Sequence, residues 1–157
     1  MTRLSYRIKT HLEPLAIAAN IAQAAHTRLD HILLTLANLY RIFDTDQIDN
    51  PLIRETVQGS LERRWKAVTE QDCFILAVFF NPYIRASCFN AESLTPNRLI
   101  QMAKSAFKRF YDEDADTEFI KAILDYSNRA GNYSDAAMLL DDHRKMADNE
   151  NKVSCPF

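Results

Sequence analysis

Residues 27–43 read TRLDHILLTLANLYRIF and carry the clearest structural pattern in the chain. Large apolar side chains recur every three or four residues there, which predicts one apolar face along an α-helix. The side chains on this face are Leu29, Ile32, Leu33, Leu36, Leu39, Tyr40 and Phe43. Upstream, residues 15–25 are rich in alanine, which favours helix. Pro14 is expected in the first turn of that helix, where its missing N–H costs nothing.

The helical pattern continues after a polar loop over residues 44–51. Asn50 can cap a helix that has Pro51 in its first position. This helix is expected to run to about Val68, with its core side chains three and four residues apart: Leu52, Ile53, Val57, Leu61, Trp65 and Val68.

Residues 72–80 read DCFILAVFF and are apolar almost all round. Such a segment is typical of a helix that is buried on every side, so we expect one central apolar helix at Asp72–Phe80. Thr69 is placed to cap this helix. Pro82 lacks a backbone donor and should stop or kink it.

Three more helices are expected in the second half. Thr95-Pro96 predicts the start of a helix whose core face is Leu99, Met102, Ala103, Ala106, Phe107 and Phe110. After an acidic linker, Asp116 or Thr117 should cap a helix that carries Phe119, Ile120, Ile123, Leu124 and Tyr126. Gly131 fits the C′ position after that helix. A last helix is expected over Tyr133–Asp148, with Ala137, Leu140 and Met146.

These patterns predict an all-α protein, an irregular bundle of about six to seven helices. We expect a single helical domain over residues 1–148, with a sub-division near 112–117 as an option, and a flexible tail over 149–157. No stretch alternates apolar and polar residues over the length of a strand.

Composition excludes several classes of protein. The 157 residues are 47% hydrophobic and 25% charged, which argues against intrinsic disorder. The formal net charge of −2 gives no overall basic field to attract nucleic acid. Three widely spaced cysteines form no disulfide framework and are expected to be buried or incidental thiols. The longest apolar runs are far too short to cross a membrane, so we expect a soluble, intracellular protein.

No set of residues has the pattern of a catalytic or metal site. The four histidines are scattered, and the acidic tracts lack the glycine and glutamate of a calcium-binding EF-hand loop. A phosphate-binding glycine loop and a nucleophile elbow are missing as well. The sequence therefore predicts no enzyme, no catalytic residue, no bound metal and no cofactor.

The segment 62–66, ERRWK, is a candidate nucleic-acid contact. Arg63, Arg64 and Lys66 could bind a phosphate backbone while Trp65 stacks on a base. Helical spacing favours another interpretation, in which Trp65 anchors the core and the cations are its solvated side. A second cationic set, Lys104, Lys108 and Arg109, is expected to be a solvated helix face.

The stretch SLERRWKAVTEQDCFILAVFFNPYIRASCFN resembles a recurring segment of hAT-type DNA transposases, especially the fungal ones. Leu61, Arg64 and Trp65 match an LxxRW helix in that family. Ile75, Leu76, Ala77, Asn81, Pro82 and Arg85 match the apolar stretch that follows it. Residues of the preceding helix, from Gln23 to Tyr40, are similar too, so the resemblance covers about residues 11–130.

The resemblance implies the helical region that interrupts a ribonuclease H-like catalytic core. The catalytic acids of the family lie on strands outside this region, and no position here matches them. It therefore implies a non-catalytic fragment, a protein-interaction module with DNA contact as a further option. Its partner would be DNA, a second copy or a transposase-like protein, and a nuclear location follows from the resemblance alone.

The alternative is a stand-alone DNA-binding module that uses the Arg63/Arg64/Lys66 face, with Arg85 as a further contact. On either interpretation Leu61, Trp65, Asn81 and Pro82 are expected to be structural.

Overall fold

The computed structural model describes residues 3–44 and 51–149. Over these residues the chain contains no strand, which confirms the predicted all-α class and the number of helices. The elements are α1 (Arg3–Gln23), α2 (Leu29–Asp44), α3 (Pro51–Thr69), α4 (Asp72–Phe79), α5 (Pro96–Tyr111), α6 (Thr117–Ser127), the 3-10 helix η1 (Gly131–Tyr133) and α7 (Leu140–Asn149).

The chain divides into two compact units, Met1–Val78 and Phe79–Phe157. We call them unit 1 and unit 2 and describe each by itself. The boundary falls at the end of α4, upstream of the acidic linker at 112–117. The single domain over residues 1–148 stays a prediction.

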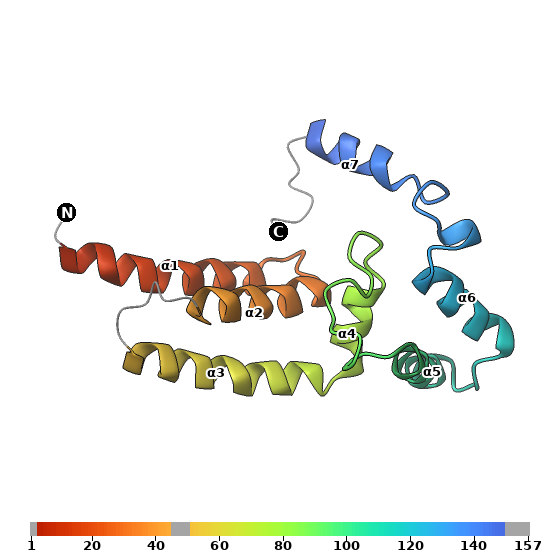
Figure 1. Ribbon diagram of the computed structural model, residues 1–157, viewed down its shortest axis with the longest axis horizontal. Coiled ribbons are helices and arrows are strands. Elements are labelled where there is room, and N and C mark those ends of the chain that lie inside the picture. The colour runs from red at the N-terminus through yellow and green to blue at the C-terminus, as the bar shows by residue number, and fades with distance from the viewer. Residues whose placement is uncertain (1–2, 45–50, 150–157) are drawn as a thin grey trace. The chain divides into compact units, whose positions relative to one another are not determined.

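Helix α2 is the centre of unit 1. It packs against both α1 and α3, whereas α1 and α3 do not pack against each other over their described residues (Figure 1). Leu39 and Phe43 of α2 meet Leu61 of α3 in a buried cluster. The partly buried side chains that pack against this cluster come from all three helices: Leu15, Ala18, Leu36, Ile42 and Val57.

The amphipathic face predicted for residues 27–43 is the buried face of α2, with two exceptions. Leu29 and Tyr40 are exposed, because this face is wider than α1 and α3 together cover. One buried residue of α2 is charged: Asp30 accepts two hydrogen bonds from the exposed Arg28, at 3.0 Å from Nε and 2.7 Å from Nη2.

Helix α1 begins eleven residues before the predicted proline start. Pro14 therefore lies inside α1 instead of in its first turn. Proline removes one backbone donor from a helix interior, but its fixed φ is close to the helical value. The prediction for Pro14 was wrong because helix signals upstream of it, in residues 3–13, were not recognised.

Helix α3 runs from Pro51 to Thr69, close to the predicted bounds, but its core is smaller than predicted. Leu61 is buried, whereas Trp65, Leu52 and Ile53 are exposed. Each four-residue step turns the position about 40° around a helix, so Trp65 lies about 80° from Val57. The interpretation of Trp65 as a core anchor is therefore wrong.

The cap predicted at residue 69, after α3, differs in the structure. The Thr69 hydroxyl donates to the Trp65 carbonyl at 2.8 Å, so Thr69 closes α3 and does not cap α4. The predicted cap Asn50 and the loop residues 45–50 lie outside the described residues.

Helix α4 is the expected apolar helix. Ile75, Leu76, Val78 and Phe79 are buried, as expected. The segment is not buried on every side, however, because Cys73 and Phe80 at its two ends are exposed. The helix ends at Phe79, three residues before Pro82, so the helix stops before the proline and is not kinked by it.

In unit 2, both predicted helix starts are confirmed. The Thr95 hydroxyl accepts a hydrogen bond from the Arg98 N–H, and the Asp116 carboxylate accepts one from the Phe119 N–H. Helix α5 packs on α6 through the rings of Phe107 and Phe119, 4.9 Å apart. Phe110, predicted to be core, is 82% exposed because the contact with α6 lies one turn earlier.

The end of α6 uses an arginine where glycine was expected. Arg129 has a φ of 55°, and the Ala130 N–H donates to the Asp125 carbonyl at 2.8 Å, as in a Schellman motif. Gly131 also has a positive φ but begins η1, so its assignment as C′ was wrong.

The last helix is shorter than predicted. Ser134 caps a single turn by accepting a hydrogen bond from the Ala137 N–H, and Leu139 has a φ of 51°, which ends that turn. Helix α7 therefore begins at Leu140 instead of Tyr133. Asn149 is its last residue, and the rest of the predicted tail lies outside the described residues.

Candidate interaction sites

An apolar groove lies between α1 and α3, with α2 as its floor. Its volume is about 670 Å³. It exists because α1 and α3 each pack on α2 and leave a space between them. The walls and floor are Leu15, Ala18, Ala19, Ile21 and Ala22 of α1, Ile32, Thr35, Leu36 and Leu39 of α2, and Thr56, Val57, Ser60, Leu61, Arg64, Ala67 and Val68 of α3.

The polar side chains on the α3 wall of the groove form hydrogen bonds within α3. The Thr56 hydroxyl donates to the Leu52 carbonyl at 2.7 Å. Among the described residues, Arg64 is the only charged one that lines the groove. Its Nη1 donates to the Ser60 carbonyl at 3.3 Å and to the Ser60 hydroxyl. No carboxylate of the described residues pairs with Arg64, so the groove is apolar with one cation on its α3 side.

The predicted basic cluster does not form one patch. Consecutive residues of a helix point about 100° apart, so Arg64 faces the groove while Arg63 and Lys66 share another side. Lys66 also lies 3.9 Å from the Glu70 carboxylate. Trp65 points in a third direction, and its side chain is 37% exposed.

The second cationic set, on α5, is partly neutralised. The Lys108 ammonium lies 2.8 Å from an oxygen of Asp114 and lowers the pKa of that exposed carboxyl through a hydrogen bond and charge attraction. Lys108 and Arg109 are exposed, in agreement with a solvated helix face, and Lys104 is half-buried.

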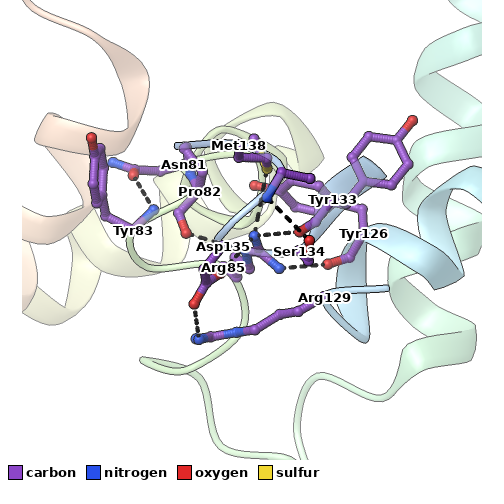
Figure 2. A network of polar contacts seen from close by, with 11 residues as sticks. Asn81, Pro82, Tyr83, Arg85, Tyr126, Arg129, Tyr133, Ser134, Asp135 and Met138 are labelled. Atoms are coloured by element: carbon purple, nitrogen blue, oxygen red, sulfur yellow. Dashed lines mark hydrogen bonds and ion pairs between the residues drawn. The ribbon is translucent and has the colours of Figure 1, made fainter. Parts of the chain in front are cut away.

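Arg85 is the most heavily bonded side chain of unit 2 (Figure 2). It is 3% exposed. Its Nη1 donates to the Tyr126 carbonyl at 3.1 Å, and its Nη2 donates to the Tyr133 carbonyl at 2.8 Å and to Asp135 at 3.2 Å. Its Nε donates to the Pro82 carbonyl at 3.1 Å. A buried guanidinium that is hydrogen-bonded to four oxygen atoms cannot contact a phosphate, so the structure does not support Arg85 as a nucleic-acid contact.

The residues before Arg85 form a turn that positions its side chain. The side-chain oxygen of Asn81 accepts a hydrogen bond from the Tyr83 N–H at 3.1 Å, and its carbonyl accepts one from the Arg85 N–H at 2.8 Å. Arg85 itself has a φ of 55°. Asn81, Pro82 and Arg85, three residues that carry the family resemblance, therefore act together in one structural turn.

The ring of Tyr126 completes this polar network. The Arg85 guanidinium lies 4.9 Å from the ring centre, and the rings of Phe79 and Tyr133 meet Tyr126 edge-on. The Tyr126 hydroxyl is buried without a hydrogen-bond partner among the described residues. Burial raises the pKa of Tyr126, and the charge of Arg85 opposes this shift.

The structure brings no metal-binding or thiol site together. No three histidine, cysteine or acidic side chains of the described residues are grouped so that they could hold a metal ion. Cys73 and Cys88 are exposed instead of buried, although partial burial of the Cys88 thiol raises its pKa. Among the described helices, none is long and apolar enough to cross a membrane.

The Arg85 network predicts an asymmetric effect of two arginine substitutions. Arg85→Met leaves the carbonyls of Pro82 and Tyr133 without the guanidinium donor, while the Tyr126 carbonyl keeps the Arg129 N–H. This change should cost about 3 kcal/mol of stability. Arg129→Met removes a partly exposed partner of Asp135, 2.7 Å away, and should cost at most about 1 kcal/mol.

Hydrogen exchange of the peptides that span residues 80–90 and 126–138, measured together with urea unfolding, separates the two variants. Arg85→Met should lose protection in both peptides. Equal protection and equal stability in the two variants would contradict the structural role of Arg85.

Comparisons with known proteins found no match: no family model fits this chain, and neither a curated protein nor a solved structure is similar to it.

Proposed function

We propose that this chain is a non-catalytic interaction module that binds a protein partner in the groove between α1 and α3. The observation that carries this proposal is the groove itself, about 670 Å³ of apolar space along three helices. Exposed apolar surface of this kind is unfavourable in a monomer and is typical of a binding site. Its lining offers no grouped carboxylates, thiols or imidazoles for catalysis.

An apolar stripe along α1 extends past the groove, which favours a macromolecular partner over a small molecule. Ile8, Leu12, Leu15, Ala19 and Ala22 follow one another at steps of four, three, four and three residues. Ile8 and Leu12 are 50% and 57% exposed and continue the groove wall beyond the groove. A stripe with this spacing is the kind of surface on which another helix packs.

The resemblance to hAT-type transposases fits the same proposal. It describes a helical region that lacks the catalytic strands, so contact with another protein is the function left to it. A second copy and a transposase-like protein are the partners that the resemblance suggests, with an intracellular and, from the resemblance alone, nuclear location. The residues that carry the resemblance have structural roles at Leu61, Asn81, Pro82 and Arg85.

Site-specific photo-crosslinking tests the groove. Benzoylphenylalanine at Thr56, which lines the groove, should give a discrete adduct in an extract of the source cells, and the same group at the neighbouring Glu55 should not. Ala19→Trp, which fills the groove, should reduce the adduct at least about fivefold. Ala16→Trp on the exposed side of α1 serves as the control.

Mass spectrometry of the adduct identifies the partner. Adducts of equal yield at Thr56 and Glu55, or an adduct that Ala19→Trp leaves unchanged, would contradict a partner in the groove.

DNA binding is the second candidate function, and the exposure of Trp65 favours it. An exposed indole can stack on an unpaired base, as a buried one cannot. Arg63 and Lys66 lie on one side of the same helix and could contact phosphates. The division of the cations between two sides of α3 and the net charge of −2 weigh against it.

Trp65 is the chain's single tryptophan, so its fluorescence reports stacking directly. If this second function holds, a single-stranded oligonucleotide quenches Trp65 at low salt, and the affinity falls steeply as salt rises. Arg63→Gln with Lys66→Gln should weaken binding, whereas Arg64→Gln, on the groove side, should not. No quenching at low salt would exclude this function.

A further inference from the structure

Unit 1 has the arrangement of a four-helix bundle that lacks one helix. In such a bundle each helix packs on two neighbours and faces the remaining helix across the core. Helix α2 packs on α1 and α3, which do not pack on each other over their described residues. Helices α1 and α3, which flank α2 in Figure 1, therefore take the two positions beside a fourth helix. The groove lined by the three helices lies where that fourth helix would pack.

The groove walls have the spacing that a fourth helix requires. On α3, Val57, Ser60, Arg64 and Ala67 follow one another at steps of three, four and three residues and all line the groove. On α1, the matching wall positions are Leu15, Ala19 and Ala22.

Several wall residues are small, and this sets the size of the side chains that the groove accepts. Ala18, Ala19 and Ala22 line the α1 wall, and Ser60 and Ala67 line the α3 wall. Small residues on one side of a helix interface leave room for large ones on the other. The occupant should therefore present large apolar side chains, such as leucine, isoleucine or phenylalanine, at helical spacing.

The charge of the α3 wall determines the second property of the occupant. Arg64 lines the groove and donates hydrogen bonds to the carbonyl and hydroxyl of Ser60, and no carboxylate of the described residues pairs with it. Within residues 3–44 and 51–149, no acidic residue lines the groove to balance this charge. Hydrogen bonds between a guanidinium and a carboxylate are among the strongest in proteins, so an acidic side chain is the complementary group.

We infer that the groove binds an amphipathic helix of another protein, with large apolar side chains on one face and a carboxylate opposite Arg64. This inference rests on the proposed function, because it names the chemistry of the partner in the same groove. It goes further in two respects. It excludes basic helices as ligands of the groove, and it predicts that Arg64 binds the carboxylate of the ligand.

Two synthetic helical peptides test this directly. Each is about 18 residues long, with leucines at alternating steps of three and four, and they differ only in glutamates or lysines beside the leucine face. Fluorescence anisotropy with the full chain should show that the glutamate peptide binds at least about tenfold more tightly. Arg64→Gln should remove most of this difference, whereas Arg109→Gln on α5 should leave it unchanged.

Ala19→Trp should abolish binding of the glutamate peptide, and Ala16→Trp should retain it, with circular dichroism to verify that both variants fold. Equal affinity of the two peptides would overturn the carboxylate assignment. No binding of either peptide would overturn the fourth-helix inference. A position-specific adduct from Thr56 would still support the proposed function in both cases, so the two failures are distinguishable.

Sedimentation of the chain alone tests whether a second copy of the chain occupies the groove. Self-association that Ala19→Trp abolishes would show that a second copy fills the groove, and this would also overturn the inference. A monomer at the concentrations of the binding assay supports it.

Discussion

The width of the apolar face of α2 is the constraint on which unit 1 depends. Leu39 and Phe43 on that face must be removed from water, and a single neighbouring helix cannot cover them together with Leu33 and Leu36. Helices α1 and α3 each cover one side, and Leu61 of α3 closes the cluster. Because both neighbours are held by α2, they stay apart, and the apolar side chains between them form the walls of a groove.

Unit 2 depends on a polar interaction instead. The buried guanidinium of Arg85 joins the turn after α4 to the end of α6 and to the turn at Asp135. The guanidinium donates to neutral carbonyls and to the carboxylate of Asp135, and it lies against the ring of Tyr126. Four residues on which the resemblance was proposed have structural uses: Leu61 lies in the buried cluster of unit 1, and Asn81, Pro82 and Arg85 form one turn of unit 2.

Local signals predicted the elements well. Helix periodicity and helix caps depend on neighbours in sequence. The structure has the predicted helix at residues 27–43, the caps Thr95 and Asp116, and buried side chains within the apolar run at 72–80. Features set by distant residues were not predictable. Tyr126, Tyr133 and Asp135, the distant partners of Arg85, lie 41 to 50 residues along the chain, and nothing near Arg85 in the sequence indicates them. The groove was missed because periodicity shows which face is apolar but not which part stays uncovered.

The separation of α1 and α3 is the central claim, and disulfide trapping tests it most directly. Ala22 and Ala67 line opposite walls of the groove. In a chain with Cys73, Cys88 and Cys155 replaced by serine, Ala22→Cys with Ala67→Cys should stay unlinked under mild oxidation, because a disulfide needs Cα atoms within about 7 Å. Rapid and complete formation of an intramolecular disulfide would show that α1 and α3 close on each other and that the groove does not exist.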